Sequence, residues 1–270
     1  MEPDLLEFDL GRGVRAFSTE RRGGYSIGAY ASFNANAYCG DDAYAVRMNR
    51  ELLCRAMGLE PARLVMPHQV HGVEVRRIDE AFFRLPEEGR KSVLEGVDAV
   101  MTDLPCVCVS VSTADCIPIL IYDVCHHAVA AVHAGWRGTL QRIPGVALQV
   151  MREAYGTKAA DVRVAIGPGI SLEAFEVGDE VFEAFREAGF PMQAMSRRFP
   201  VAGNAAGVPA EKWHLDLWQA NRDVLVSAGV PGAQIYLSGI CTYGHPERFF
   251  SARRLGIRSG RILNGIFLTE

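Results

Sequence analysis

Residues 107–139 have the sequence VCVSVSTADCIPILIYDVCHHAVAAVHAGWRGT. Within this stretch, Val107–Val111, Ile117–Tyr122 and Ala128–His133 are short runs of mostly apolar residues, separated by turn-forming residues. Runs of this length and composition are typical of strands that are covered on both faces. The stretch therefore predicts a buried sheet in the middle of the chain.

The flanking sequence adds further elements to this sheet. Apolar runs predict three more strands, at Val14–Thr19, Val97–Thr102 and Val162–Ile166. Apolar periodicity predicts four helices, at about Ala43–Met57, Gly138–Tyr155, Gly178–Ala188 and Leu215–Ala228. Because these elements do not alternate regularly and no linker or repeat interrupts them, we expect one α+β domain over residues 1–270, with layered αββα architecture and mixed sheets.

The composition is that of a soluble globular protein. Of the 270 residues, 49% are apolar and 22% charged, with 28 Lys and Arg against 32 Asp and Glu. This net charge of −4 gives no reason to expect nucleic-acid or membrane partners. The seven cysteines are an odd number, the start of the chain is acidic, and no apolar run reaches the length of a membrane span, so we expect a reducing, cytoplasmic location.

Three residues that bind metals well lie where strands are predicted to run into turns. They are His71, Cys116 and His133. Two imidazoles and one thiolate suit zinc or copper, and three protein ligands leave a coordination position open, as in catalytic zinc sites. Their spacing matches no short metal signature, so the interpretation as a buried cysteine and hydrogen-bonded histidines stays open.

The same residues also support a mechanism without metal. A Cys116 thiolate activated by His133 would be a nucleophile with its base, as in cysteine hydrolases. Chelation would inactivate a metal enzyme, whereas alkylation of the thiol would inactivate a hydrolase. A third class, a binding or scaffold module in which zinc only braces the fold, also stays open.

Several motifs together resemble the laccase-domain family, whose members are described both as multicopper polyphenol oxidases and as purine nucleoside phosphorylases. The central ones are HQVHG at 68–72, ADC at 114–116, HAGWRGT at 133–139, and GPGI at 167–170 followed by FEVG at 175–178. Towards the ends of the chain, the motifs are SFN at 32–34, GDD at 40–42, FSARR at 250–254 and GR at 260–261. The resemblance therefore covers almost the whole sequence.

This resemblance implies a fold, a metal and a ligand set. The layered fold is similar to that of the cytotoxic-necrotizing-factor-like cysteine hydrolases, and the metal is zinc held by His71, Cys116 and His133, with His68 as the less favoured alternative to His71. The chain departs from the family where relatives carry cysteines, at 171–174, and at Ala252, where they often carry an aromatic residue.

Phosphorolysis of a purine nucleoside requires cations that bind phosphate. Arg137 is the leading candidate, followed by Arg50, Arg253 and Arg254; the alternative for each is a surface or carboxylate-paired arginine. Trp136 is the candidate for stacking on the base, with Phe33 and Tyr25 behind it, although large aromatic residues are more often part of the core.

Adenosine deamination would use the same metal with a carboxylate that moves protons. Asp115 and Glu176 are the candidates, with structural alternatives: Asp115 would orient His133 or a backbone turn, and Glu176 would cap the following helix. A conventional multicopper oxidase requires more histidines than the seven present, although a single copper would also suit the three ligands.

The sequence thus predicts a zinc-dependent purine nucleoside phosphorylase acting on adenosine, inosine, guanosine or methylthioadenosine, with accompanying adenosine deaminase activity. The alternatives are a copper-dependent polyphenol oxidase and a metal-free hydrolase that uses Cys116 and His133. The expected partners are the nucleoside and phosphate. The sequence does not indicate which oligomeric state the protein has.

Overall fold

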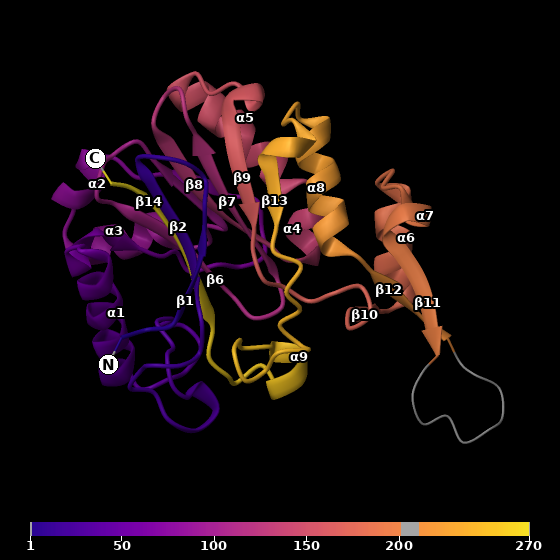
Figure 1. The fold of residues 1–270 in the computed structure, drawn as a ribbon, viewed down its shortest axis with the longest axis horizontal. Coiled ribbons are helices and arrows are strands. Elements are labelled where there is room, and N and C mark those ends of the chain that lie inside the picture. The colour runs from indigo at the N-terminus through magenta and orange to yellow at the C-terminus, as the bar shows by residue number, and fades with distance from the viewer. Residues whose placement is uncertain (1, 201–210, 270) are drawn as a thin grey trace.

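The computed structural model describes residues 2–200 and 211–269, and its centre is formed by two mixed sheets (Figure 1). The five-stranded sheet has the order β1 (Leu5–Phe8), β2 (Val14–Thr19), β14 (Ile262–Leu268), β6 (Cys108–Thr113) and β3 (Leu64–Val65). The six-stranded sheet has the order β13 (Ile235–Leu237), β9 (Val162–Ile166), β7 (Ile117–Asp123), β8 (Ala128–Ala134), β5 (Ala99–Thr102) and β4 (Val75–Arg77). All six predicted strands are present, with ends that differ by at most two residues.

Alternation along the strands explains why the two sheets pack against each other. On β7, Leu120 and Tyr122 belong to a buried cluster shared with residues of the other sheet, such as Val109 and Ile266. Ile119 lies on the opposite face of β7, among helix residues. Since successive strand side chains point to opposite faces, the apolar run of β7 fills two cores at once.

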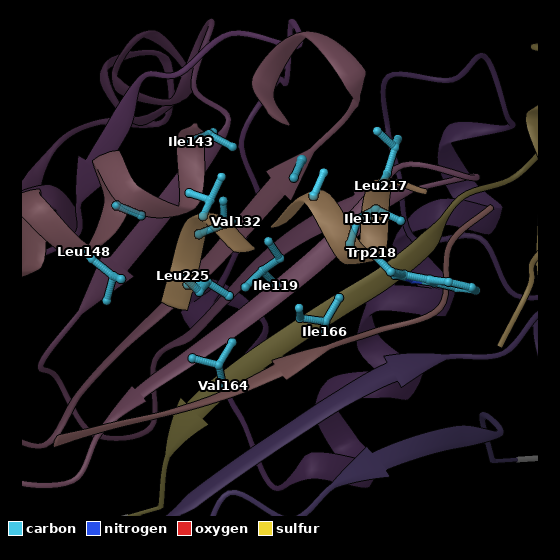
Figure 2. Packing of buried hydrophobic residues seen from close by; sticks show 14 of the residues in the cluster. Ile117, Ile119, Val132, Ile143, Leu148, Val164, Ile166, Leu217, Trp218 and Leu225 are labelled. Atoms are coloured by element: carbon cyan, nitrogen blue, oxygen red, sulfur yellow. The ribbon is translucent and has the colours of Figure 1, made fainter. Parts of the chain in front are cut away.

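Helices cover the outer faces of both sheets. The helices of the described residues are α1 (Ala43–Met57), α2 (Glu80–Arg84), α3 (Glu87–Leu94), α4 (Trp136–Leu140), α5 (Ile143–Tyr155), α6 (Asp179–Glu187), α7 (Met192–Met195), α8 (Leu217–Ser227) and α9 (Ala252–Leu255). Helices α5 and α8 pack on the six-stranded sheet, where Leu148 and Leu225 meet Val132 and Ile119 (Figure 2). Helix α1 packs on the five-stranded sheet through Leu53 and lies at the left in Figure 1. The order of layers is therefore helix, sheet, sheet, helix.

The first predicted helix is confirmed with its ends. Asp42 caps α1 by accepting a hydrogen bond from the backbone N–H of Ala45 at 2.9 Å. Gly58 ends the helix in the left-handed conformation, with φ 71°. This conformation favours glycine, which has no Cβ to clash.

The predicted helix over Gly138–Tyr155 is wrong as a single element. The structure has α4 and α5 instead, with Arg142 between them at φ 61°. Pro144 explains the break, because it lacks the N–H that a continuous helix would need and is well suited to the first turn of a new one. Helix α4 itself follows directly on β8, the strand that carries His133.

A third, small sheet was not predicted from the sequence. It consists of β10 (Glu176–Val177), β12 (Glu211–Leu215) and β11 (Ser196–Pro200), and it lies at one end of the molecule with α6 (Figure 1). The rings of Phe182 and Trp213 stack 3.8 Å apart and join α6 to this sheet. Consequently, α8 begins at Leu217, two residues later than predicted, with Asp216 as its cap.

The cysteines and the length of the helices bear on two expectations from the sequence. All seven cysteines are free. Among the described residues, no helix combines the length and the apolar character needed to cross a membrane.

Candidate metal centre and cavity

The structure brings His71, Cys116 and His133 together at one end of the two sheets. His133 lies near the end of β8, Cys116 directly precedes β7, and His71 lies in the loop between β3 and β4. Their ligand atoms all lie within 4.8 Å of one another, and Cys116 Sγ is 3.8 Å from His71 Nε2. In the described part of the chain, this is the one cluster of three or more His, Cys, Asp or Glu side chains arranged so that they could hold a metal ion.

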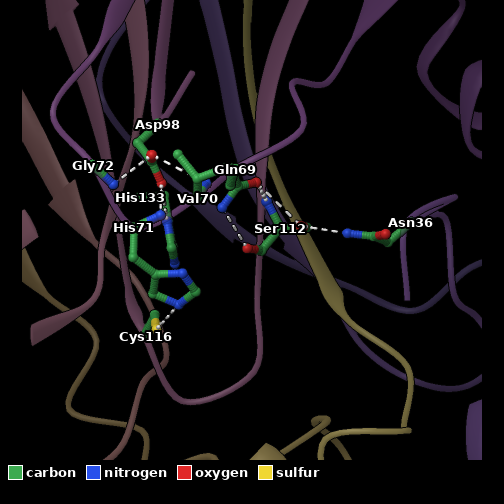
Figure 3. A network of polar contacts seen from close by, with 9 residues as sticks. All are labelled: Asn36, Gln69, Val70, His71, Gly72, Asp98, Ser112, Cys116 and His133. Atoms are coloured by element: carbon green, nitrogen blue, oxygen red, sulfur yellow. Dashed lines mark hydrogen bonds and ion pairs between the residues drawn. The ribbon is translucent and has the colours of Figure 1, made fainter. Parts of the chain in front are cut away.

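A buried carboxylate that the sequence analysis did not identify holds this group in place. Asp98 is fully buried, and its Oδ1 lies 2.8 Å from His133 Nδ1 (Figure 3). The same carboxylate accepts hydrogen bonds from the backbone N–H groups of Val70, His71 and Gly72, at 3.2, 2.9 and 2.7 Å. Asp98 therefore orients one ligand ring and fixes the loop that carries another.

Carboxylates behind a metal-binding histidine select its tautomer and orientation. A hydrogen bond from Nδ1–H of His133 to Asp98 leaves Nε2 of the imidazole free to bind a metal. The arrangement of a carboxylate, a histidine and an open face is that of a built metal site. A signal for it was present in the sequence, since Asp98 is an acid within the apolar run of Val97–Thr102.

Gly135 allows the ligands to approach one another. A Cβ at this position would lie 2.8 Å from His71 Cδ2 and 3.1 Å from Cys116 Sγ. The first distance is shorter than real Cβ atoms show and the second is tighter than most, so a side chain at this position would displace the His71 ring. The backbone of His71 itself has φ 64°, a left-handed conformation that the bonds from Asp98 hold in place.

The electrostatics of the group favour a deprotonated sulfur. Burial raises the pKa of the Cys116 thiol, but the charge of His133 and hydrogen bonds with His133 and His71 outweigh this effect and lower the pKa to about 6. Burial lowers the pKa of His133, whereas Cys116 and Asp98 together raise it to about 9. For Asp98, the bonds from His133 and the loop amides outweigh burial and hold its pKa below the usual range.

The group opens onto a cavity of about 290 Å³. A hydrogen-bonded network forms part of its wall: Gln69 Oε1 accepts from the N–H of Ser112 at 2.7 Å, and Asn36 Nδ2 donates to Ser112 Oγ at 2.6 Å (Figure 3). The aromatic ring of Tyr38 and the exposed side chain of Ile257 also line the cavity. Polar and apolar surfaces thus face the metal-binding group together.

His68 does not belong to the metal-binding group. Its Nδ1 lies 2.8 Å from Glu95 Oε1, and its ring stacks on Tyr38 with centroids 4.4 Å apart. These contacts hold the ring in the wall of the cavity. Of the two histidines in the HQVHG motif, His71 is therefore the one placed with Cys116 and His133.

Asp115 braces a turn and does not contact His133. Its Oδ1 accepts a hydrogen bond from Thr242 Oγ1 and its Oδ2 one from the N–H of Arg253, each at 2.7 Å. Of its two structural alternatives, the bracing of a backbone turn is the one observed, and Asp98 is the residue that orients His133. A catalytic role of Asp115 stays a prediction.

Three further predicted residues lie outside the lining of the cavity. Arg137 is exposed and stacks over Trp136, with its guanidinium carbon 4.2 Å from the ring centroid. Trp136 is partly buried and packs on the core of the six-stranded sheet. Glu176 is exposed on β10, where its backbone C=O accepts a hydrogen bond from Arg253. Their predicted roles in catalysis and binding stay predictions.

The other predicted arginines are also separate from this cavity. Arg253 is exposed and donates to the carbonyls of Ala174 and Glu176, at 3.5 and 3.1 Å. Arg254 is exposed over the ring of Tyr243. Arg50 lines a different cavity, of about 730 Å³, beside α1 and α3, and burial lowers its pKa. Their predicted substrate contacts stay untested, as do those of Tyr25, which is 48% exposed, and Phe33, which is buried in the core.

Two histidines and one cysteine that line one cavity of a layered α+β fold form a candidate site for a metal ion. The family described as multi-copper polyphenol oxidoreductase laccase matches residues 15–269, and the chain belongs to this family. The resemblance inferred from the motifs is confirmed.

Relatives and solved structures give the comparison more detail. The chain is 48% identical to a purine nucleoside phosphorylase of Bacteroides thetaiotaomicron, over 94% of this chain and 92% of the relative. It is 44% identical to adenosine deaminase RL5 of an unknown prokaryotic organism, over 99% of both chains. The crystal structure of YlmD from Geobacillus stearothermophilus superposes with a TM-score of 0.83 at 32% identity, covering 96% of this chain and 93% of that one.

Proposed function

We propose that this protein is a metal-dependent purine nucleoside phosphorylase, with zinc as its metal and adenosine deamination as an accompanying activity. The observation that carries the proposal is the group of His71, Cys116 and His133, braced by Asp98 and open to a cavity. The names of the two most similar relatives reported above support purine nucleosides as the substrate class.

The donor set fits zinc. Two imidazole nitrogens and a thiolate are typical zinc ligands, and the absence of a fourth protein ligand among the described residues is typical of catalytic sites. A bound zinc would act as a Lewis acid towards an oxygen or nitrogen of the substrate. The low pKa of Cys116 supports this assignment, because the thiolate is the form that binds the metal.

The protein's own residues would position the nucleoside. The Tyr38 ring, held by its stacking on His68, offers an aromatic surface for the purine beside the apolar side chain of Ile257. Gln69 and Ser112, fixed to each other by hydrogen bonds, offer polar atoms to the ribose hydroxyls. Asp98 stays behind His133, where it holds the imidazole in one orientation during the reaction.

Product analysis tests this function. Purified protein of measured metal content is incubated with adenosine, with and without inorganic phosphate, beside a Cys116→Ala variant. We expect adenine and ribose 1-phosphate only when phosphate is present, a smaller yield of inosine with or without phosphate, and neither activity in the variant. If the zinc-loaded protein releases no free base from adenosine, inosine, guanosine or methylthioadenosine, the proposal fails.

A metal-free cysteine hydrolase is the second candidate, and one observation favours it. Cys116, His133 and Asp98 also form a chain of nucleophile, base and orienting carboxylate, with the pKa of the thiol lowered to about 6. The layered fold of the cytotoxic-necrotizing-factor-like cysteine hydrolases would suit this interpretation. Activity that survives chelation and is abolished by alkylation would favour it over the phosphorylase.

The family's name would suggest a third candidate, a copper-dependent polyphenol oxidase. A single copper would suit the same three ligands, since copper binds such sites more tightly than zinc. The described residues provide one metal-binding group and no second cluster for further coppers. Oxidation of a phenol by copper-loaded protein would therefore reflect a single copper ion in the place of zinc. The zinc-loaded protein should not catalyse this oxidation.

A further inference from the structure

An arginine that was not among the predicted site residues lines the metal cavity. Arg261 directly precedes β14, whose first residue, Ile262, pairs with Thr113 of β6. This register places Arg261 beside Ala114, two residues before Cys116 in the sequence. Of the residues that line this cavity, Arg261 is the one Arg or Lys.

The guanidinium of Arg261 is fixed by neutral partners. Its Nη1 donates to the carbonyls of Ser259 and Gly260, at 2.6 and 3.0 Å, and its Nη2 donates to the carbonyl of Ile257 at 2.9 Å. Its backbone N–H donates to Asn34 Oδ1 at 3.0 Å. The side chain is therefore ordered before any ligand binds, which lowers the entropic cost of binding.

The positive charge of Arg261 has no carboxylate partner in the part of the chain that the structure describes. Other arginines do have one; Arg248, for example, pairs with Glu20 and Arg77 with Asp103. The N–H of Nε and one hydrogen on Nη2 also have no protein partner among the described residues. A guanidinium with free N–H groups binds an oxyanion through paired hydrogen bonds.

The composition of the cavity wall also favours an anionic ligand. The residues that line it include no Asp or Glu, and its remaining polar groups are hydroxyls, amides, thiols and imidazoles. Glu95, the nearby acid that pairs with His68, is not among the lining residues of this cavity. Outside the metal-binding group of His71, Cys116 and His133, the cavity wall therefore contains one cation, Arg261, and no anion, and this favours a negatively charged ligand.

We propose that Arg261 forms an oxyanion subsite of the metal cavity and that its ligand is inorganic phosphate. This assignment rests on the proposed function, in which phosphate is the second substrate. Arg261 would hold hydrogen phosphate while one oxygen of this phosphate forms a bond to C1′ of the ribose. The bond from C1′ to N9 breaks, its electron pair leaves with the purine, and the proton of hydrogen phosphate ends on the base nitrogen.

The same chemistry would also bind the phosphate of a nucleotide. A 5′-phosphate of adenosine monophosphate presents the same oxygens to a guanidinium. Inorganic phosphate is the occupant assigned here, because the proposed phosphorolysis uses it as the second substrate and requires it in the cavity together with the nucleoside. Titration with each compound separates the two sources.

The test uses metal-loaded full-length protein and the variants Arg261→Gln and Arg261→Lys. Arg258→Gln is the matched control, since Arg258 is exposed on the same loop and does not line the cavity. The shift of Tm on titration with inorganic phosphate, without nucleoside, reports binding, and the KM for phosphate with adenosine reports its use in turnover. Metal content is measured for each variant, and only variants with wild-type metal content are compared.

We expect phosphate to raise the Tm of the wild type and of Arg258→Gln, and to have a weaker effect on Arg261→Lys and none on Arg261→Gln. The KM for phosphate should rise about tenfold or more in Arg261→Gln. If Arg261→Gln binds phosphate as well as the wild type does, the subsite is overturned. It is also overturned if adenosine monophosphate raises the Tm of the wild type and inorganic phosphate does not. If the wild type binds phosphate through Arg261 but releases no base, the subsite stands and the proposed function fails.

Discussion

Asp98 and His133 are joined by a hydrogen bond of 2.8 Å between Oδ1 and Nδ1, and both side chains are buried. Asp98 directly precedes β5, His133 lies on its antiparallel neighbour β8, and the backbone N–H of His133 also donates to the carbonyl of Asp98 at 2.8 Å. The bond therefore connects the sheet directly to a candidate metal ligand. Because the same carboxylate binds the loop of His71, one residue organises two of the three ligands.

Replacing Asp98 by Asn should weaken metal binding. The amide would keep the size of the side chain but lose the charge that holds His133 and the loop amides, and loss of such partners typically costs about 10–100-fold in metal affinity. Competition with a chromogenic chelator measures the affinity. Asp103→Asn is the control, since Asp103 lies in a surface pair with Arg77. Equal zinc affinity of wild type and Asp98→Asn would contradict the role of Asp98.

Removal of the metal should expose a reactive thiolate. The pKa of Cys116 is lowered to about 6, so in metal-free protein the thiolate is the main form at neutral pH and is lost as the pH falls below about 6. Iodoacetamide should then modify Cys116 with a rate that rises through about pH 6 and is constant above it. Peptide mass spectrometry follows the reaction at each cysteine.

Two comparisons make this alkylation experiment decisive. The exposed thiol of Cys125 has a pKa raised by desolvation and by the nearby acids Asp161 and Asp123, so its rate should rise only at alkaline pH. Zinc-loaded protein should protect Cys116 while Cys125 stays reactive. Rapid alkylation of Cys116 in the zinc-loaded protein would show that its sulfur does not bind the metal.

Gly135→Ala should abolish zinc binding while the fold is retained. The added Cβ would lie 2.8 Å from the His71 ring and 3.1 Å from the Cys116 sulfur, so the ligands would have to move apart. Gly145→Ala is the matched control, because in α5 its Cβ would meet Val224 at an ordinary 3.5 Å and alanine favours a helix by about 1 kcal/mol. Metal content after purification separates the two variants. Full zinc occupancy of Gly135→Ala would contradict the close approach.

The apolar strand β7 should contribute strongly to stability. Ile119 is fully buried between the six-stranded sheet and its helices, and Ile119→Ala should lower the free energy of unfolding by about 2–5 kcal/mol. Val226→Ala, at a residue that is 42% exposed on α8, should change it by about 0.5 kcal/mol or less. Urea unfolding followed by circular dichroism measures both. Similar values for the two variants would show that β7 is not the centre of the core.

Local patterns were sufficient to predict the central strands. Runs such as Ile117–Tyr122 consist of residues that favour strands, and each side chain of the observed β7 is buried on one face or the other, so no tertiary effect opposes the local preference. The small sheet of β10, β11 and β12 was missed because β10 is only two residues long and the exposed Arg197 and Arg198 give β11 little apolar pattern. The pairing of β10 with β12 joins Glu176 to His214, across α6, α7 and β11, and no local pattern encodes such a contact.

The sequence was sufficient to predict the three candidate metal ligands, but the residues around them only in part. His71, Cys116 and His133 lie in motifs with specific neighbours, and the fold brings them together as expected. Of the four arginines predicted to bind substrate, Arg137, Arg253 and Arg254 lie in motifs and Arg50 does not, and the structure places none of the four on the lining of the metal cavity. Arg261 reaches the cavity through the pairing of β14 with β6, a contact between strands about 150 residues apart in the chain.

The most direct test of the account follows the oxygens of phosphate. Zinc-loaded protein is incubated with adenosine and phosphate labelled with oxygen-18, and the sugar product is analysed by mass spectrometry. If a phosphate oxygen attacks C1′, the product is ribose 1-phosphate that retains all the labelled oxygens of phosphate, and adenine is released in equal amount. Unlabelled free ribose, or inosine as the one product, would contradict phosphorolysis at this metal centre.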